Sequence, residues 1–257
     1  MTGSLISEIN KNDDNLLKPN CFRLLGQIID TSSVSVVERL LKVAISNQNS
    51  DIATSAIVCT YFMTLKGFPV AKSWISEISD KLTTSFGQEN LMTFHILLLL
   101  KAIKSSDKLF LIKIYCKIAD NQHSKSQFAL CQLIRYVSDM MKNEELENNI
   151  LNNFNAFLER SLYSLDDSVK IEACRAILES QKTKAALQKN AISVVCDMLG
   201  SSNKIVKYAA LRTLNRYISA FSSTLAIDIF LEIEKIIEDN NVNSSIKAIA
   251  LSIFLKI

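Results

Sequence analysis

Apolar residues recur along this chain at the spacing that places them on one side of an α-helix. The pattern is clearest in three stretches that begin at Val169, Val206 and Ile246. Each has an apolar residue at its first position, lysine at the second, alanine at the fifth and another apolar residue at the ninth. The alanines are Ala173, Ala210 and Ala250. Because a helix has about 3.6 residues per turn, these apolar and alanine positions share one stripe, and the small alanine lets a second helix approach it closely.

Weaker copies of the stripe begin at Leu17, Ile52, Leu91 and Gln127, so that successive starts are 35 to 42 residues apart. A second segment with helical spacing lies between each pair of starts. These partner segments are residues 34–45, 70–82, 109–119, 146–162, 185–199 and 225–237. Self-similarity with this period and two helices per unit is typical of HEAT and armadillo arrays. We therefore predict an all-α fold in which residues 1–257 form a single curved α-solenoid of six to seven helix pairs.

Composition supports this fold class. The chain of 257 residues is 48% hydrophobic but contains only five glycines and two prolines, too few for the turns of a β-sandwich or a doubly wound sheet. A solenoid can exceed the usual size of a single core because each repeat contacts only its neighbours. The net charge of +3 does not call for a nucleic-acid partner. Residues 160–216 contain ten Lys or Arg and five Asp or Glu, which we interpret as solvated helix faces.

Candidate chemistry is sparse. None of the six cysteines forms a Cys-x-x-Cys pair, and their places on apolar stripes indicate small buried hydrophobes in a reducing cytosol. The two histidines, His95 and His123, are far apart, and no glycine-rich phosphate loop is present. Trp74 lies on an apolar stripe with Ile78 and is expected in the core. We predict no catalytic, cofactor or metal site and no small-molecule substrate. The longest apolar run, 96–100, is too short to span a membrane.

Polar clusters separate the helical segments. They are residues 49–51, 166–168, 201–203 and 243–245, and each contains Asn, Asp or Ser directly before an apolar stripe. Such side chains accept hydrogen bonds from the free N–H groups at the start of a helix. Asp166 and Asp167 could instead act as paired catalytic carboxylates, but their position before a helix favours capping.

A series of stretches, all in the same order along the chain, resembles one protein family. Residues 207–215 (Lys-Tyr-Ala-Ala-Leu-Arg-Thr-Leu-Asn) are similar to a repeat of the gamma subunits of coatomer, the large adaptor-like subunits of the COPI vesicle coat. Further matching stretches are 23–30, 37–40, 72–77, 94–98, 121–135 and 245–251. Ala-x-Arg-x-Leu alone recurs in many helical repeats, whereas a collinear series over the whole chain is specific. The departures, such as 142–147 and 180–184, fall mainly in loops.

The resemblance implies that this chain is the middle of an N-terminal trunk, with further repeats and an appendage domain beyond it. The end of the chain inside the apolar stretch 251–257 agrees with a piece of a longer solenoid. The family further implies a small zeta subunit held by the trunk and other coatomer subunits as partners. It also implies docking of a GTP-loaded Arf-family GTPase. The expected location is the cytoplasm and the surface of Golgi membranes, and the expected role is retrograde transport to the endoplasmic reticulum.

In that family the GTPase surface lies on early trunk helices, and two of these correspond to about residues 17–29 and 51–65. Their outward side chains are candidate GTPase contacts; an ordinary solvent-facing surface is the alternative. The candidates are Lys18, Asn20, Asn49, Asp51 and Thr54. Three arginines share one slot of the repeat, and we expect them to tie neighbouring repeats through carbonyl or carboxylate bonds. They are Arg23, Arg175 and Arg212.

Two alternatives remain within the class of binding proteins: a clathrin-adaptor large subunit and a karyopherin. A karyopherin would bind a Ran-type GTPase and transport signals in place of an Arf-family GTPase and a zeta subunit. An enzyme with a site in a helical bundle is the contrasting class, and it would need a polar pocket with perturbed titratable groups. The sequence offers no residues for such a pocket.

Overall fold

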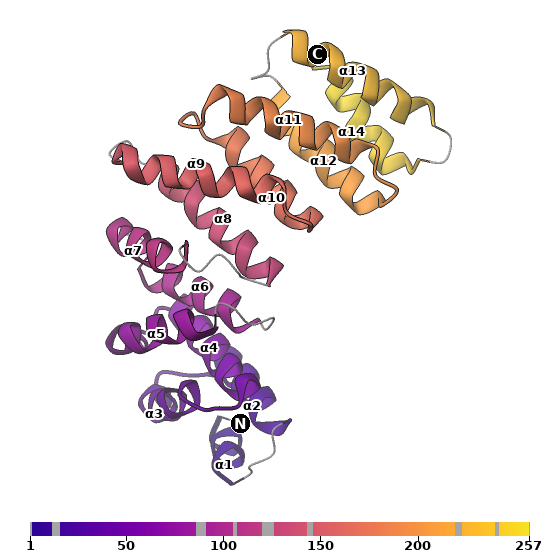
Figure 1. Cartoon of the computed structure of the whole chain (residues 1–257). Helices are drawn as coiled ribbons and strands as arrows, with labels where there is room; N and C mark the ends of the chain where they lie inside the picture. Colours follow the sequence, from indigo (N-terminus) through magenta and orange to yellow (C-terminus); the bar gives the residue numbers. More distant parts are fainter. Residues whose placement is uncertain are drawn as a thin grey trace. The chain divides into compact units, whose positions relative to one another are not determined.

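The computed structural model describes residues 2–11, 16–85, 91–104, 107–119, 126–142, 146–218, 223–239 and 242–256. Within these ranges every regular element is helical (Figure 1). The elements are α1 (Thr2–Lys11), α2 (Leu17–Ile28), α3 (Val34–Ile45), α4 (Ser50–Leu65), η1 (Lys72–Trp74), α5 (Ile75–Ser85), α6 (Met92–Ile103), α7 (Lys108–Ala119), α8 (Gln127–Met141), α9 (Asn148–Leu162), α10 (Asp167–Glu179), α11 (Ala185–Leu199), α12 (Lys204–Tyr217), α13 (Ser223–Glu238) and α14 (Ser244–Phe254). The all-α prediction is confirmed.

The predicted repeats correspond to the even-numbered helices. Each of the seven stripe starts falls within, or one residue before, an even helix from α2 to α14, and the partner segments fall on α3 to α13. For α3 and α11 the predicted and observed bounds are the same. The apolar period therefore identifies which segments pack, because burial of the stripe stabilises each helix.

One partner segment is built differently from the prediction. A continuous helix was expected over 70–82, but the structure has the 3₁₀ turn η1 followed by α5, which runs on to Ser85. Before it, α4 ends at Leu65, and Gly67 in the turn that follows has a φ of 87°, a conformation that favours glycine. The apolar stripe is nevertheless buried at Val70, Trp74 and Ile78. Periodicity thus locates the buried side chains but does not distinguish a 3₁₀ from an α-helical start.

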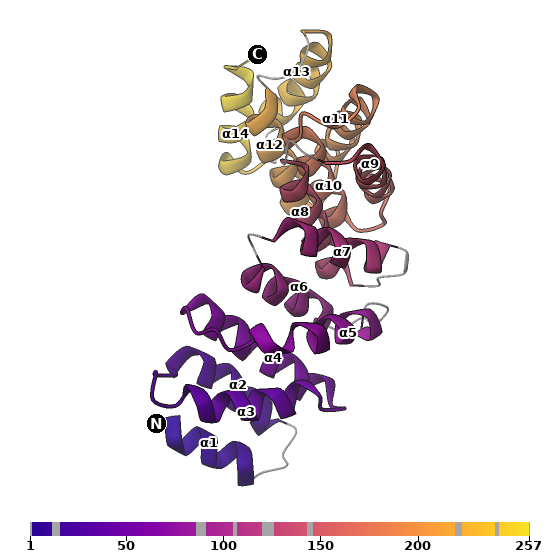
Figure 2. The same cartoon turned by 90° about the vertical axis from the view of Figure 1, so that its left-hand side faces the viewer.

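The chain divides into two compact units, residues 1–133 and residues 134–257. In the first unit, α2 packs on α4 and α4 on α6, while α1, α3 and α5 each pack on one of these helices. In the second unit, α10 packs on α12 and α12 on α14, with α9, α11 and α13 packed against them (Figure 2). Each unit is therefore a two-layered stack of helix pairs, as in an α-solenoid. The single solenoid over residues 1–257 stays a prediction.

Small residues lie where even helices meet. Ala173, Ala210 and Ala250 are fully buried. In the first unit Gly26 of α2 faces α4, and a Cβ placed on it would lie 3.0 Å from the Cα atom of Cys59. Side chains of this size let the two helix backbones come close, as the repeat pattern predicts.

Three of the six cysteines are buried as expected, and Cys131 and Cys196 are half-buried. Cys21, Cys59 and Cys174 are buried, and burial raises the pKa of Cys59 and of Cys174 to about 12. Their thiols are therefore protonated and unreactive at neutral pH. Cys116 departs from the expectation, because it is exposed on α7.

Candidate interaction surfaces

The five candidate GTPase contacts lie around the first turns of α2 and α4, which pack side by side. We call Lys18, Asn20, Asn49, Asp51 and Thr54 the α2/α4 surface. Asn20 and Asp51 are exposed, whereas Lys18, Asn49 and Thr54 are half-buried. Packing of the two helices thus brings together residues that are separated by about thirty positions in the sequence.

The Asn49 side chain caps helix α4 at this surface. Its Oδ1 atom accepts hydrogen bonds from the backbone N–H groups of Asp51 at 2.9 Å and Ile52 at 3.3 Å, which caps α4. The Asp51 carboxylate lies in the first turn of α4, where the helix dipole favours negative charge. Asn20 accepts a hydrogen bond from Arg23 Nη1 at 3.1 Å and stays exposed. Asn20 and Asp51 are consequently the candidates best placed to reach a partner.

A cleft of about 210 Å³ borders the α2/α4 surface. Its apolar lining includes Ile9, Phe22 and Val43, and Lys18 supplies part of its polar edge. Val43 is 74% exposed, so apolar surface is open to solvent here. The cleft is formed by α1, α2, α3 and the start of α4, and no single stretch of sequence could reveal it. It could accept an apolar side chain of a partner.

The other polar clusters also cap helices, with one exception. Asn203 accepts from Ile205 N at 3.0 Å at the start of α12, and Asn243 accepts from Ser245 N at 3.1 Å at the start of α14. Asp166 occupies the same position before α10, but its side chain makes no capping bond, contrary to the prediction. Asp167 forms an ion pair with Lys170, 3.2 Å between Oδ1 and Nζ. Neither geometry indicates a catalytic carboxylate pair.

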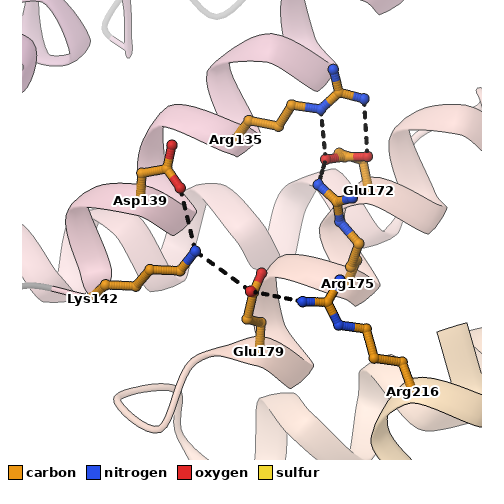
Figure 3. Close-up of polar contacts among 7 residues, drawn as sticks. All are labelled: Arg135, Asp139, Lys142, Glu172, Arg175, Glu179 and Arg216. Atoms are coloured by element: carbon orange, nitrogen blue, oxygen red, sulfur yellow. Dashed lines mark hydrogen bonds and ion pairs between the residues drawn. The ribbon is translucent and has the colours of Figure 1, made fainter. Parts of the chain in front are cut away.

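Two carboxylates join neighbouring even helices in the second unit (Figure 3). Glu172 of α10 accepts from Arg135 of α8, with Nε to Oε1 at 2.8 Å and Nη2 to Oε2 at 3.4 Å. It also accepts from Arg175, one turn along α10. The Glu172 side chain is only 11% exposed, so the two guanidinium groups neutralise a nearly buried charge.

The second carboxylate connects three helices. Glu179, at the end of α10, lies 3.4 Å from Lys142 Nζ and 3.3 Å from Arg216 Nη2 of α12. Lys142 also lies 3.4 Å from Asp139 within the same turn (Figure 3). We call these residues together with Arg135, Glu172 and Arg175 the carboxylate network.

The expected arginine ties are made by other residues. Arg23 and Arg175 form hydrogen bonds within their own helices, and Arg212 has no hydrogen bond or ion pair with any described residue. The bonds between even helices come instead from Arg135 and from Arg216, each bonded 37 residues away. A search for charged pairs one repeat apart could have found these two bonds. The spacing of residues within one helix could not.

His95 is half-buried on α6, beside the ring of Phe94 with centroids 5.1 Å apart. Burial lowers the pKa of His95, and the positive charge of Arg23 lowers it further. The imidazole is therefore neutral at physiological pH. His123 lies outside the described residues. In the part of the chain that the structure describes, no three His, Cys, Asp or Glu side chains are grouped as a metal site, and no helix is long and apolar enough to cross a bilayer.

Comparison with known proteins gives a consistent result. The family model described as Adaptin N terminal region matches residues 2–257. Coatomer subunit gamma-2 of Oryza sativa subsp. japonica is 30% identical over 257 residues, all of this chain and 28% of the relative. Coatomer subunit gamma of Anopheles gambiae is 29% identical over 261 residues, and coatomer subunit gamma-1 of Homo sapiens is 29% identical over 258 residues. Both cover all of this chain and 29% and 28% of those proteins.

The chain thus spans somewhat more than a quarter of the length of these relatives. Among solved structures, a designed armadillo repeat protein aligns over 100% of this chain and 99% of its own, at 12% identity and a TM-score of 0.41. The helix packing within each unit is the basis of the α-solenoid assignment.

Proposed function

The chain belongs to the family of adaptin N-terminal regions, and from this membership we propose that it is part of a scaffold subunit of a COPI-type vesicle coat. The observation that carries the proposal is the similarity to coatomer gamma subunits along all of its residues, in a plant, an insect and a mammal. In this role it works by protein–protein contact at the cytosolic surface of Golgi membranes. It serves transport from the Golgi to the endoplasmic reticulum.

The physical character of the chain suits a scaffold. Helix pairs stacked on each other present long rows of side chains at their outer faces. A standard protein interface buries about 800 Å² on each partner, which a few neighbouring helices can supply. Partners in this proposal are a small zeta subunit, other coatomer subunits and a GTP-loaded Arf-family GTPase.

We assign the GTPase contact to the α2/α4 surface. The switch regions of a GTPase become ordered around the γ-phosphate, so a partner selective for the GTP form needs an apolar patch with a polar rim. The cleft beside Phe22 and Val43 supplies apolar surface, and Asn20 and Asp51 supply an exposed polar rim. Asn49 contributes by holding the first turn of α4 in place.

The test is co-purification of the chain, extended by the upstream repeats of its own protein, with a zeta subunit and a GTP-locked Arf-family GTPase. The GDP-bound GTPase is the negative control. In a second arm, Asn20→Arg combined with Asp51→Arg places two bulky cations at the rim. We expect this variant to bind the GTP-locked GTPase at least about tenfold more weakly, because like-charged or clashing rim groups oppose docking. Ser193→Arg combined with Asp197→Arg, at two exposed sites on α11, changes the net charge equally and is the matched control.

Retention of zeta binding by the double variant would show that it is folded. Equal GTPase binding by the double variant and the wild type would refute the assignment to the α2/α4 surface. Failure of the unmodified protein to bind either partner would refute the coat function itself.

A further inference from the structure

Helix α12 differs from its neighbours in charge. It contains Lys204, Lys207, Arg212 and Arg216 and no Asp or Glu. The next even helix, α14, contains Lys247 and also lacks acidic residues. These two helices pack side by side in the second unit (Figures 1 and 2). Five cations are therefore gathered on two adjacent helices without a carboxylate on either.

Most of these cations lack a counter-charge. Arg216 pairs with Glu179. Lys204, Lys207 and Arg212 form no hydrogen bond or ion pair with any residue that the structure describes. On the other flank of α12, the α10 carboxylates Glu172 and Glu179 are each already held by two cations of the carboxylate network (Figure 3). Three of the four cations of α12 thus have no paired carboxylate among the described residues.

The exposed side of α12 combines this charge with apolar surface. Lys204, Ile205, Tyr208 and Arg212 follow one another at the spacing of helical turns and share one face, and we call them the α12 stripe. Ile205 is 78% exposed and Tyr208 is 37% exposed. Exposed apolar and aromatic side chains next to an unpaired arginine are more typical of a protein-binding site than of the rest of a protein surface.

We infer that the α12 stripe is a docking site for an acidic segment of a partner protein, most simply a helix with an apolar face flanked by Asp and Glu. Its carboxylates would pair with Lys204 and Arg212, and its apolar side chains would cover Ile205 and Tyr208. A second helix laid along α12 meets side chains at the same three- and four-residue spacing. Phosphate groups of a nucleic acid would satisfy the cations but leave Ile205 unpaired with apolar surface. Binding to a bilayer needs a broad exposed apolar helix face, whereas Val206, Leu211 and Leu214 of α12 are buried. The site lies in the second unit, apart from the α2/α4 surface, and does not depend on the function proposed above.

The experiment uses the full chain and a synthetic probe. The probe is a fluorescein-labelled peptide of roughly 18 residues with leucines at i, i+4, i+8 and i+11 and glutamates beside them, long enough to populate a helix. Fluorescence anisotropy measures its affinity in salt of about 50 mM and about 200 mM, because surface charge attraction weakens with ionic strength. A peptide with glutamine in place of each glutamate tests the need for acid. Phosphatidylserine-containing vesicles and an oligouridine RNA are the other two probes.

Three variants locate the binding. Lys204→Glu with Arg212→Glu reverses the charge of the stripe, and Ile205→Ser with Tyr208→Ser removes its apolar part. We expect the first to weaken peptide binding at least about tenfold and the second about fivefold. Lys184→Glu with Lys189→Glu, two exposed lysines at the start of α11, reverses the same charge elsewhere and should leave the affinity unchanged. All substituted side chains except Tyr208 are well exposed, so the circular dichroism spectrum should stay that of the wild type.

Binding of the acidic peptide that falls with salt and is weakened only in the two stripe variants supports the inference. Equal effects of the double reversal on α11 and the double reversal on the α12 stripe would overturn it, as would equal binding of the glutamine peptide. Absence of peptide binding would overturn it too. Stripe-dependent binding of only the vesicles, or only the RNA, would assign the cations to lipid or nucleic acid and exclude the protein partner.

Discussion

The two units connect their helices with different polar groups. In the first unit, the short bonds between repeats run from lysines to main-chain oxygens of the preceding repeat, whereas the ion pairs Lys42–Glu77 and Lys117–Asp80 are exposed and longer, at 3.7 and 4.0 Å. Lys66 Nζ bonds the carbonyl of Gln27 near the end of α2, and Lys81 Nζ bonds the carbonyls of Ile45 at 2.6 Å and Asn47 at 3.1 Å after α3. The carbonyl ends of helices carry partial negative charge, which makes them suitable acceptors for lysine.

In the second unit the acceptors are the side chains of the carboxylate network, and the donors are chiefly arginine. Among its described residues, a lysine also bonds a main-chain oxygen at the last pair of even helices, α12 and α14, where Lys256 Nζ lies 3.0 Å from Asn215 O. Arginine suits the carboxylates because its planar group donates in two directions, whereas the single charge of lysine suits a carbonyl. Neighbouring repeats can therefore be joined either by ion pairs between side chains or by lysine bonds to the carbonyl ends of helices. The two kinds of bond should respond differently to mutation and pH.

The largest effect is expected where helix backbones approach most closely. Gly26→Val would place a Cβ 3.0 Å from Cys59 Cα and 3.2 Å from Cys59 O. Because backbone atoms cannot yield as a side chain can, we expect a loss of about 3 kcal/mol in the stability of the first unit. Hydrogen exchange of α2 and α4 amides measures this loss. Gly3→Val on α1, where nothing lies within 4 Å, should change little. Unchanged protection of α4 would contradict the close approach.

A smaller effect is expected from the carboxylate network. Glu172→Gln keeps the shape of the side chain but removes the charge that Arg135 and Arg175 share. The side chains of these arginines are 46% and 39% exposed, so water compensates part of the loss. We expect the free energy of unfolding to fall by about 1–2 kcal/mol, which is less than the cost of leaving a fully buried charge unpaired. Hydrogen exchange of α8 and α10 measures it, with the exposed Glu159→Gln as control. Similar exchange in both variants would show that the network adds no stability.

The smallest effect concerns pH in the first unit. The folded protein lowers the pKa of His95, so the unfolded chain binds a proton at higher pH than the folded one. Stability is therefore complete above the unfolded pKa of about 6.5, and it falls as the pH drops from there toward the folded pKa. His95→Gln should remove this slope. Melting temperatures at about pH 7.5 and about pH 5.5 test it, and an equal drop in the wild type and the variant would exclude His95 as its cause.

The sequence predicts the elements of this fold well because burial acts locally along each helix. Val206, Ala210 and Leu214 are all buried on α12, and their spacing alone identifies the stripe. The bonds between helices could not be predicted in the same way. Arg135 and Glu172 meet only because one repeat stacks on the next in a particular register, which no local pattern contains.

For the α2/α4 surface, too, the sequence predicts the local features but not those that depend on packing between helices. Exposure of Asn20 and Asp51 follows from their positions outside the apolar stripe. The capping task of Asn49 follows from its place before α4, so its side chain is already engaged. The neighbouring cleft could not be predicted from the sequence, because residues of four different helices form its walls.

The lysine bonds to main-chain oxygens have a consequence for how such a chain can diverge. Every amino acid carries a carbonyl group, so the residues that receive Lys66 and Lys81 can be replaced by others without loss of the bond. Only the donor is constrained. The carboxylate network, by contrast, requires an acid and a base to be kept together. The residues at the helix ends of the first unit should therefore change during evolution, while the lysine bonds keep the spacing between successive repeats the same.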